Sequence, residues 1–535
     1  MTDRARPRRF LFVMHYPGYL RYFDSAIRML VAHGHHVDVA FDSPDKQAEG
    51  LEALSAMPGV EVLGRMPNRR DVWAVVARAV RGTLDYARYL HPDFADTPYL
   101  RDRMQTALPP VMGFLARRPP ARVAALNRLT NTLRTCERAI PSSAVLEHFL
   151  RSRRPDAVIV TPLVTDRSPQ VDVVKSAHAL GIPAAVCVAS WDHLTTKGLI
   201  RVQPDLVTVW NHEQQREALT YHRVAEESIV VTGANPFDRW FERRPSDRET
   251  FCRKIGLPAE RPYVLFVGST ASISAPGAEL MFVRQWIAAL RREPALADAG
   301  ILVRPHPYNS AHWADVDLSD LPNVAVYPRT ANPVNESDRQ DYFDSLYHSE
   351  AVVGVNTTAM IEAAIVGRTV HTVLADEFKD TQGGTLHFRY LLHENGGFLR
   401  VARSLPEHAT QVAETLRSPE IGRAACARFV ASFVRPQGLD VPSTPILVAA
   451  LERLAAPGPV RAPVRVPAPL YPLSAALWAG GCVAVYKEPH RLKGLLYKQY
   501  RISKARVRDA IRRGRKTAPT RPGESGDELL RRKVG

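Results

Sequence analysis

The sequence has 535 residues, of which 45% are hydrophobic and 24% are charged, so it is too long for one hydrophobic core and suits two globular domains with additional segments. Its five cysteines stand far apart, with no Cys-x-x-Cys pair and no histidine cluster at zinc spacing: Cys136, Cys187, Cys252, Cys426 and Cys482. This pattern excludes a disulfide-based scaffold and a zinc finger, and it favours a reducing cytosol.

The net charge of +16 is concentrated at the C-terminus. Residues 487–535 hold 16 Lys and Arg against 5 Asp and Glu, which is +11, and the other 486 residues carry only +5. The rest of the chain has no RNA-binding motif and no basic strand interleaved with aromatics, so we expect no nucleic-acid partner. The N-terminus, MTDRARPRRF, is basic but leads into an apolar run of only about five residues, too short for a signal peptide.

Short apolar runs alternate with helical stretches along the chain. The first series covers residues 10–14, 36–41, 60–64, 156–161, 184–189, 206–210 and 229–233, and the second covers 263–268, 301–305, 324–328, 351–355, 369–374 and 398–402. Near-continuous apolar strands separated by helices indicate parallel sheets covered on both faces. The predicted fold class is therefore α/β, with two doubly wound, Rossmann-like domains facing a cleft.

The runs also suggest domain limits. We expect a first domain over residues 1–240, with a long helical insertion at about 67–150 whose apolar residues follow helical spacing. A second domain should cover 241–456, since the stretch 234–262 contains no strand-like run and joins the two series. Residues 457–535 would form a proline-rich linker and a basic amphipathic tail.

Candidate catalytic residues follow two strands of the first series. In doubly wound sheets, ligands bind beyond the carboxyl ends of the strands. The run 184–189 is followed by SWDHLTTKGL, where Asp192 and His193 stand at a strand end, and the carboxylate of Asp192 can accept a proton from a substrate hydroxyl. His15, at the end of the first strand, is its rival as the base. A packing or capping role remains open for His15, and an Asx-turn or helix-cap role for Asp192.

Candidate donor-binding residues follow two strands of the second series. VRPHPYN places Arg304 and His306 at a strand end between prolines, where a guanidinium and an imidazole suit a phosphate. In VVGVNTTAMIEAAIVGR, Asn356 or Thr357 caps a new helix whose free N–H groups can hold an anion, and Glu362 lies about one turn further on, placed to bond a ribose hydroxyl. Capping alone explains Asn356 and Thr357 equally well.

Two other polar stretches have less defined roles. TQGGTLHFRY places His387 and Arg389 past a strand end. Asp315 and Asp317 form an Asp-x-Asp triplet in a polar stretch with helix-start character, where a solvated loop is the preferred interpretation. We therefore expect no metal, so that a helix N-terminus and cationic side chains must stabilise the departing nucleotide.

The motifs resemble those of the two-Rossmann-domain (GT-B) glycosyltransferases and of the related non-hydrolysing nucleotide-sugar 2-epimerase. SIVVTGANPFD, residues 228–238, is similar to the Val-Thr-Gly-Asn segment of that epimerase, and GVNTTAMIEAAIVGRTV resembles the nucleotide-diphosphate segment of the family. The insertion at 67–150 has no counterpart in this resemblance.

A second element of the resemblance is His-Pro followed by a Ser/Thr pair. Bacterial sialyltransferases, capsule-polymer transferases and CDP-glycerol glycerophosphotransferases mark the donor phosphate in this way. His306 with Pro307 would be the first element, and Thr357 with Thr358 the second. The sialyltransferase acid motif, two acidic residues followed by Gly, is absent, and residues 191–193 stand in its place, which leaves the identity of the base open.

The resemblance implies an inverting, metal-independent glycosyltransferase without a cofactor. It would move a sugar, or a glycosyl or glycerol phosphate, from an activated nucleotide donor to a polysaccharide or lipid-linked acceptor in the cytosol. Two alternatives stay open: a nucleotide-sugar 2-epimerase, and a non-catalytic membrane-associated subunit of a polysaccharide assembly. The insertion and the basic tail favour a transferase with a large or lipid-linked acceptor, since an epimerase needs neither.

The C-terminal segment predicts a membrane contact. LYPLSAALWAGGCVAVY, residues 470–486, has no charge and directly precedes the basic tail. A spanning helix needs about 20 apolar residues, and this run contains Pro472, Gly480 and Gly481. We expect peripheral attachment to an anionic membrane surface, at the inner face of the cytoplasmic membrane. The alternative is that residues 470–486 pack back on the first domain.

Overall fold

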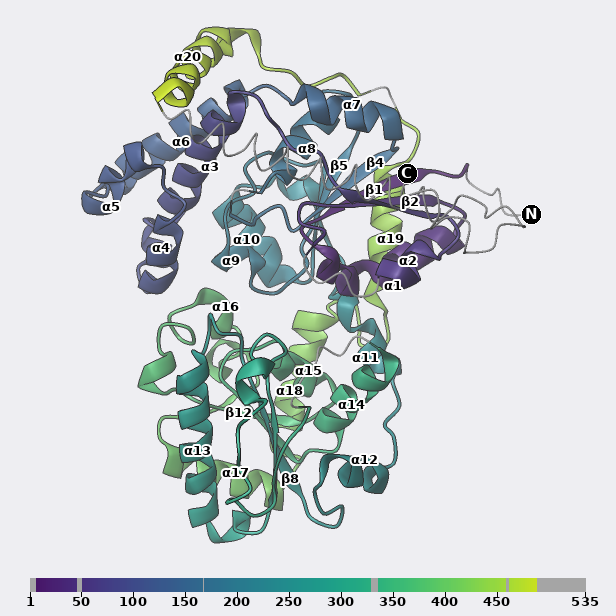
Figure 1. The fold of residues 1–535 in the computed structure, drawn as a ribbon, viewed down its shortest axis with the longest axis vertical. Coiled ribbons are helices and arrows are strands. Elements are labelled where there is room, and N and C mark those ends of the chain that lie inside the picture. Colours follow the sequence, from purple (N-terminus) through teal and green to yellow (C-terminus); the bar gives the residue numbers. More distant parts are fainter. Residues whose placement is uncertain (1–5, 46–50, 167, 329–334, 459–460, 488–535) are drawn as a thin grey trace, which may run out of the picture. The chain divides into compact units, whose positions relative to one another are not determined.

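The computed structural model describes residues 6–45, 51–166, 168–328, 335–458 and 461–487 (Figure 1). The chain divides into two compact units, Met1–Ser474 and Ala475–Gly535. The predicted basic tail lies outside the described residues, apart from its first residue, Lys487.

Two parallel sheets organise the first unit. The strands of the first sheet are β1 (Arg9–Met14), β2 (His36–Phe41), β3 (Val60–Arg65), β4 (Ala157–Thr161), β5 (Ala184–Cys187), β6 (Leu206–Val209) and β7 (Ile229–Val231). Those of the second are β8 (Tyr263–Val267), β9 (Gly300–Arg304), β10 (Val324–Val326), β11 (Ala351–Gly354), β12 (Thr369–Val373) and β13 (Arg400–Ala402). The strand orders are β3-β2-β1-β4-β5-β6-β7 and β10-β9-β8-β11-β12-β13. Both follow the doubly wound order in which the direction of winding reverses beside the first strand, which confirms the predicted fold class.

The first sheet is buried on both faces because its strands are apolar at successive positions. Phe10 and Phe12 of β1 pack in one core cluster with α1 (Leu20–Ala32), whereas Leu11 and Val13 pack in another with α7 (Ala144–Arg153) and α8 (Gln170–His178). Side chains alternate between the two faces of a strand, so a continuous apolar run supplies both cores.

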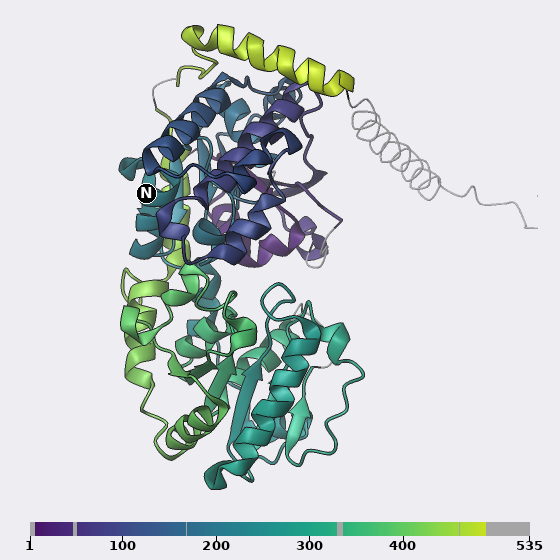
Figure 2. The same cartoon turned by 90° about the vertical axis from the view of Figure 1, so that its left-hand side faces the viewer.

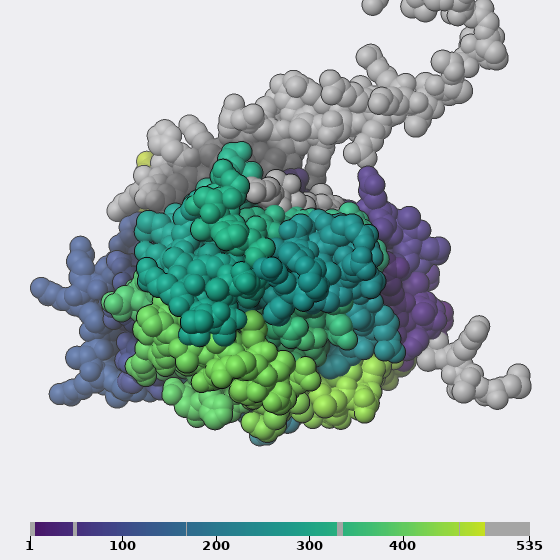
Figure 3. Space-filling view, turned by 90° about the horizontal axis from the view of Figure 1, so that it is seen from below, coloured from purple at the N-terminus to yellow at the C-terminus, as the bar shows by residue number. Residues whose placement is uncertain are grey.

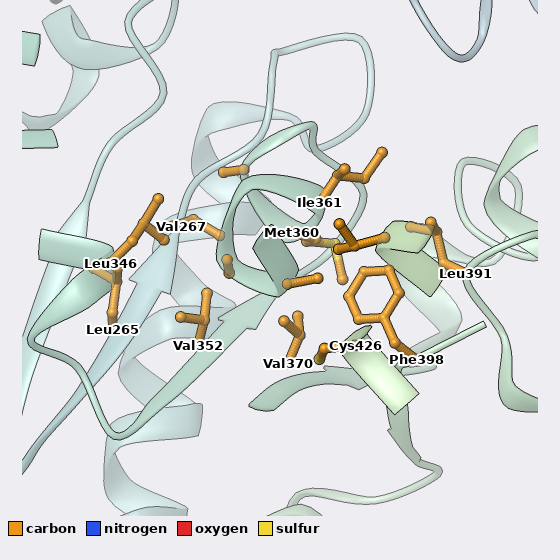
Figure 4. Close-up of a cluster of buried hydrophobic side chains, with 14 of the residues drawn as sticks. Leu265, Val267, Leu346, Val352, Met360, Ile361, Val370, Leu391, Phe398 and Cys426 are labelled. Atoms are coloured by element: carbon orange, nitrogen blue, oxygen red, sulfur yellow. The ribbon is translucent and has the colours of Figure 1, made fainter. Parts of the chain in front are cut away.

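The second sheet is covered in the same way. Helices α12 (Arg248–Ile255), α14 (Glu336–Tyr347), α15 (Ala359–Ile365) and α18 (Arg423–Phe429) contribute to the core on one face, and α13 (Pro276–Arg292) and α17 (Leu405–Arg417) to that on the other. Met360 and Ile361 of α15 belong to the same core cluster as Val352 and Val370 of the strands, and Figure 4 shows Met360 on the side of the helix that faces them. This packing fixes α15 directly beyond the end of β11.

Helix α19 (Ser443–Leu454) returns the chain to the first sheet. Leu447 and Leu451 belong to the same core cluster as Phe10, although by sequence position α19 falls in the expected second domain, 241–456. The chain therefore crosses between the sheets twice. Asp238, in the first of these connections, is hydrogen-bonded to the second. Its carboxylate accepts hydrogen bonds from the backbone N–H of Ser443 (2.9 Å) and of Thr444 (2.7 Å).

The segment between β3 and β4 is the predicted helical insertion. It contains α3 (Trp73–Arg88), α4 (Pro98–Gln105), α5 (Phe114–Arg117) and α6 (Val123–Ala139), followed by α7. Helices α3 and α6 lie side by side (Figures 1 and 2). Arg81 of α3 bonds Glu137 of α6 and Asp172 of α8, so buried charges join the insertion to the first sheet's helices.

The remaining helices are short, except for two. They are α2 (Leu51–Ser55), α9 (His193–Thr196), α10 (His212–His222), α11 (Asp238–Glu242), α16 (Leu386–Arg389) and α20 (Tyr471–Lys487). The proline-rich linker before α20 has no helix or strand over residues 461–467, and the backbone N–H of Val464 donates to the carbonyl of His178 (2.9 Å). Part of the linker is thus held against the first domain.

Candidate active site

The predicted site residues lie at the carboxyl ends of the central strands of both sheets. In each sheet these are the strands at which the winding reverses, or strands next to them. His15 directly follows β1, and Asn356 lies two residues beyond β11. A hydrogen bond joins the two sheets here: the indole Nε1–H of Trp191, beyond β5, donates to Oγ1 of Thr358, at the start of α15 (3.3 Å). The segment that carries Asp192 and His193 therefore contacts the helix start that carries the predicted donor residues.

Asp192 is a strongly stabilised carboxylate. It accepts hydrogen bonds from the hydroxyls of Ser190 (2.6 Å) and Thr196 (2.9 Å), and the ammonium of Lys197 lies 4.0 Å away. Burial raises the pKa of Asp192, but Lys197, His193 and other nearby groups outweigh burial, so that the net pKa lies well below the usual range. A carboxylate with so low a pKa is a weak proton acceptor at neutral pH.

His193 and Tyr19 form a stacked pair beside Asp192. Their ring centroids are 6.2 Å apart, and both side chains are buried. Burial lowers the pKa of His193 to about 4, and its Nδ1 has no hydrogen-bond partner among the described residues. The imidazole is thus neutral at physiological pH and lacks the basicity of a good general base.

His15 has the geometry of a general base. Its Nδ1 lies 3.3 Å from Oδ2 of Asp42, which also accepts a hydrogen bond from the Gln170 amide (3.2 Å). Asp42 is buried, whereas 26% of the His15 side chain is exposed. When the Asp42 carboxylate accepts Nδ1–H, Nε2 of His15 is left as an acceptor that a substrate can reach.

Arg304 is a buried cation without a counter-ion. Its exposed fraction is 7%, and within the described ranges no carboxylate lies within ion-pair distance of it. The guanidinium lies over the ring of Tyr342 at 4.7 Å, and Nη1 has no hydrogen-bond partner in the part of the chain that the structure describes. Burial lowers the pKa of Arg304, which reflects the cost of a charge removed from water. An anion bound here would offset that cost.

His306 is placed as a neutral donor beside Arg304. The backbone N–H of Tyr308 donates to Nδ1 of His306 (3.2 Å), so the neutral ring carries its proton on Nε2. Burial lowers the pKa of His306 to about 4, with a further contribution from Arg21. At the end of β8, a Cβ on Gly268 would lie 2.7 Å from the backbone nitrogen of His306, so only glycine allows this approach.

The start of α15 offers free backbone donors near these cations. The N–H groups of Thr357, Thr358 and Ala359 donate to no acceptor in the part of the chain that the structure describes. Strands β9 and β11 both border β8, so the loops carrying His306 and Thr357 are separated by two strand spacings, about 10 Å. Arg304, His306 and the helix start thus surround one end of β8.

Glu362 and Arg21 complete the polar surroundings. Glu362 accepts a hydrogen bond from the Tyr342 hydroxyl, and burial raises the pKa of Glu362 to about 7. Arg21, on the first turn of α1, acts electrostatically on both His306 and Glu362. Arg21 was not identified from the sequence, although its place seven residues after a predicted strand end, at the start of the following helix in HYPGYLRYF, was a usable signal.

His387 and Arg389 have different surroundings. The His387 ring lies 4.7 Å from that of Trp191, and its Nε2 is 3.4 Å from the Asn356 amide nitrogen. Burial lowers the pKa of His387 to about 4, so this ring is also neutral. Arg389 instead pairs with Asp96 of the insertion (3.6 Å). Among the described residues, no group of three His, Cys, Asp or Glu side chains can hold a metal ion.

No protein-family model and no curated protein matches the sequence. Solved structures with a similar fold include a UDP-GlcNAc 2-epimerase from Methanocaldococcus jannaschii (12% identity, 83% of this chain and 99% of that chain, TM-score 0.47) and a glycosyltransferase from Rickettsia africae (11%, 85% and 100%, 0.49). A variant of the wall teichoic acid polymerase TagF is another (10%, 85% and 90%, 0.42). Similarity this weak carries no argument about activity, and the fold class rests on the strand orders of the chain itself.

Proposed function

We propose that the chain is a metal-independent glycosyltransferase that uses a nucleotide-activated sugar. The observation that carries the proposal is Arg304, a buried guanidinium with no counter-ion among the described residues, beside the Nε2–H of His306 and the N–H groups at the start of α15 that are free within the same residues. These donors suit the diphosphate of a nucleotide sugar, and they lie where a doubly wound sheet binds its ligand.

The first domain supplies the base in this proposal. His15 Nε2 accepts the proton of an acceptor hydroxyl, whose oxygen attacks the anomeric carbon of the donor sugar. The bond to the nucleotide breaks, and its electron pair leaves with the diphosphate, which Arg304 and His306 stabilise. Asp192, which stays ionised, provides negative charge near the sugar as positive charge develops on its ring. The structure thus favours His15 over Asp192 as the base, the reverse of the order inferred from the sequence.

The donor site is tested by binding experiments with UDP, CDP, CMP and GDP and with their sugars. Arg304→Gln and His306→Ala should each weaken nucleotide binding by about 10- to 100-fold, because a charge-assisted phosphate contact contributes roughly 1.5–3 kcal/mol. Thr357→Pro removes one free N–H and should also weaken it. Arg292→Gln, at an exposed arginine at the end of α13, is the control. Unchanged affinity in both the Arg304 and His306 variants would falsify the donor site.

The reaction type needs a separate measurement. A glycosyltransferase consumes the nucleotide sugar only when an acceptor is present, apart from slow hydrolysis. A nucleotide-sugar 2-epimerase converts it to an isomer with no acceptor at all. Incubating the purified chain with the nucleotide sugar that it binds, and analysing the sugar with and without membrane lipid extract, separates the two reactions.

We also propose that the chain is cytoplasmic and attaches to the inner face of the cytoplasmic membrane. Within the described ranges, Ala468–Tyr486 is the one helical segment long and apolar enough to span a membrane by length and composition. If it spanned, the +11 segment after it would lie on the opposite side from the first unit, whereas basic segments favour the cytoplasmic side. A helix lying in the interface keeps both on one side.

The tip of the insertion supports a second membrane contact. Val111 and Phe114 are exposed by 76% and 48%, and Figure 3 shows the insertion, in blue, projecting from the molecule. From 103 to 136 the sequence has six arginines and no acidic residue, and Arg117, Arg118 and Arg122 are exposed. Exposed apolar side chains flanked by cations suit an anionic lipid surface.

Vesicle flotation tests both contacts. The full chain should float with vesicles containing anionic lipid at low salt and much less at high salt. Deleting residues 470–535 should remove most of this binding, and Val111→Ser with Phe114→Ser should reduce it further. Exchange of two exposed residues away from the tip, Val145→Ser and Ile421→Ser, is the control. If the full chain does not bind anionic vesicles at low salt, the proposed attachment to the membrane is wrong.

A further inference from the structure

A cavity of about 780 Å³ lies where the chain passes between its two sheets. Phe241 and Glu242, in α11, line it from the outgoing connection, and Asp440 lines it from the returning connection, so two carboxylates stand beside three arginines in the lining. The last residues of α15 and the turn after them form another wall. None of the residues assigned to the donor site lines this cavity, so it is a separate site.

Two arginines face the cavity without counter-ions. Among the described residues no carboxylate lies within ion-pair distance of Arg368 or Arg423, and Nε of Arg368 is buried with no hydrogen-bond partner. The third arginine of the lining, Arg435, is different, because it pairs with the buried Asp238 (3.2 Å). Burial lowers the pKa of Arg368, the carboxylate of Glu350 partly offsets that effect, and the nearby charge of Arg423 lowers the pKa further, so two like charges lie near each other.

Aromatic side chains border the same space. The Arg368 guanidinium lies over the ring of Tyr347 at 5.2 Å, and Phe241 lines the cavity beside Arg435, whose guanidinium lies 3.5 Å from the Phe241 ring centroid. An anion between Arg368 and Arg423 would relieve their repulsion, and an apolar or planar group would cover the aromatic rings. The volume is well within the range of small-molecule sites.

We propose that this cavity is a second ligand site, which binds a small phosphorylated organic molecule with its phosphate between Arg368 and Arg423. The ligand contacts both connections between the sheets, so its binding is coupled to their geometry. It also contacts the end of α15, whose other end carries Thr358 of the donor site. The helix has 7 residues, which is about 10 Å. Through this rigid helix the ligand modulates nucleotide binding, a consequence that rests on the proposed donor site.

Calorimetry with phenyl phosphate and inorganic phosphate tests the site itself. The full chain carrying Arg304→Gln and His306→Ala lacks the main phosphate contacts of the donor site. It should still bind one molecule of phenyl phosphate, with a lower Kd than that for inorganic phosphate. Adding Arg368→Gln and Arg423→Gln should weaken binding by about tenfold or more. Arg428→Gln, on the exposed side of α18 and outside the cavity, is the matched control. The exposed Arg423→Gln alone serves if the double exchange unfolds the chain.

Tyr347→Ala tests the contribution of the ligand's aromatic ring separately from that of its phosphate. It should reduce the advantage of phenyl phosphate over phosphate and leave phosphate binding unchanged. Equal phenyl phosphate binding with and without the Arg368 and Arg423 exchanges overturns the second site, whatever the fate of the donor site. If phenyl phosphate binds at this site but leaves the nucleotide Kd of the unaltered chain unchanged, the coupling through α15 is refuted and the site stands.

Discussion

The indole N–H of Trp191 donates a hydrogen bond to the Thr358 hydroxyl across 3.3 Å, and this bond joins the carboxyl edge of the first sheet to the helix start of the second. Trp191 is 3% exposed, and its ring packs edge-on against His387. The stretch SWDHLTTKGL therefore contacts the other domain as well as ending a strand.

Trp191→Phe should weaken nucleotide binding by about 2- to 10-fold, because it removes a net hydrogen bond of roughly 0.5–1.5 kcal/mol while keeping an aromatic ring against His387. Thr358→Val removes the other partner. In a double-mutant cycle by calorimetry, the two exchanges should be clearly non-additive. Additive losses would show that the bond does not contribute to the binding-competent arrangement.

Two variants decide between the candidate bases. His15→Gln should lower kcat by roughly 100-fold or more with little change in nucleotide affinity, as expected on loss of a general base. Asp192→Asn keeps the size of the side chain and should lower kcat less, because the pKa of Asp192 already lies too low for proton transfer. If Asp192→Asn abolishes turnover and His15→Gln does not, Asp192 is the base and His15 supports the site.

The strands could be predicted from sequence because they are buried on both faces, as the uninterrupted apolar runs in β1 and β8 show. The apolar runs also predicted where the strands end, and therefore that His15, Asp192, Arg304 and Asn356 lie at or just beyond strand ends. The return of α19 to the first sheet was not predicted, because an amphipathic helix indicates that it covers a sheet and not which sheet.

The electrostatic state of the site could not be predicted, because it depends on how side chains within one turn are oriented and on contacts between residues far apart in sequence. Asp192 was expected to accept a proton, but the turn places Ser190, Thr196 and Lys197 where they stabilise its ionised form. The pairing of His15 with Asp42 requires the ends of β1 and β2 to be neighbours, which the register of the sheet establishes and the sequence does not.

Glu217 gives the protein a pH-dependent stability. It is buried on α10 and accepts a hydrogen bond from the Tyr390 hydroxyl of the second domain (2.7 Å), and burial raises the pKa of Glu217 to about 8. The folded state therefore binds a proton that the unfolded state loses near its ordinary pKa of about 4.5, and stability falls as pH rises from about 4.5 to about 8.

Glu217→Gln keeps an acceptor for Tyr390 and removes the ionisation. Its Tm should match the unaltered protein near pH 5 and exceed it above pH 8, by about 2 °C or more, which corresponds to roughly 1 kcal/mol in a large domain. Glu227→Gln, at an exposed residue just after the same helix, is the control. Parallel pH profiles for the Glu217 variant and the unaltered protein would contradict the raised pKa.

Arg81 should be the most sensitive charge of the insertion. It is 5% exposed and bonds both Glu137 (2.9 Å) and Asp172 (2.9 Å), which belong to α6 and α8. Burial raises the pKa of both carboxyls, but Arg81 together with the nearby Lys175 and Arg69 outweighs burial, and both pKa values lie below their usual range. Arg81→Met leaves two buried carboxylates with less compensation, and breaking such a pair costs about 3–5 kcal/mol.

Arg78→Met, one turn earlier on the exposed side of α3, should change the unfolding free energy by no more than about 0.5 kcal/mol. Equal denaturant midpoints for the two variants would show that the buried charges do not hold the insertion to the first sheet.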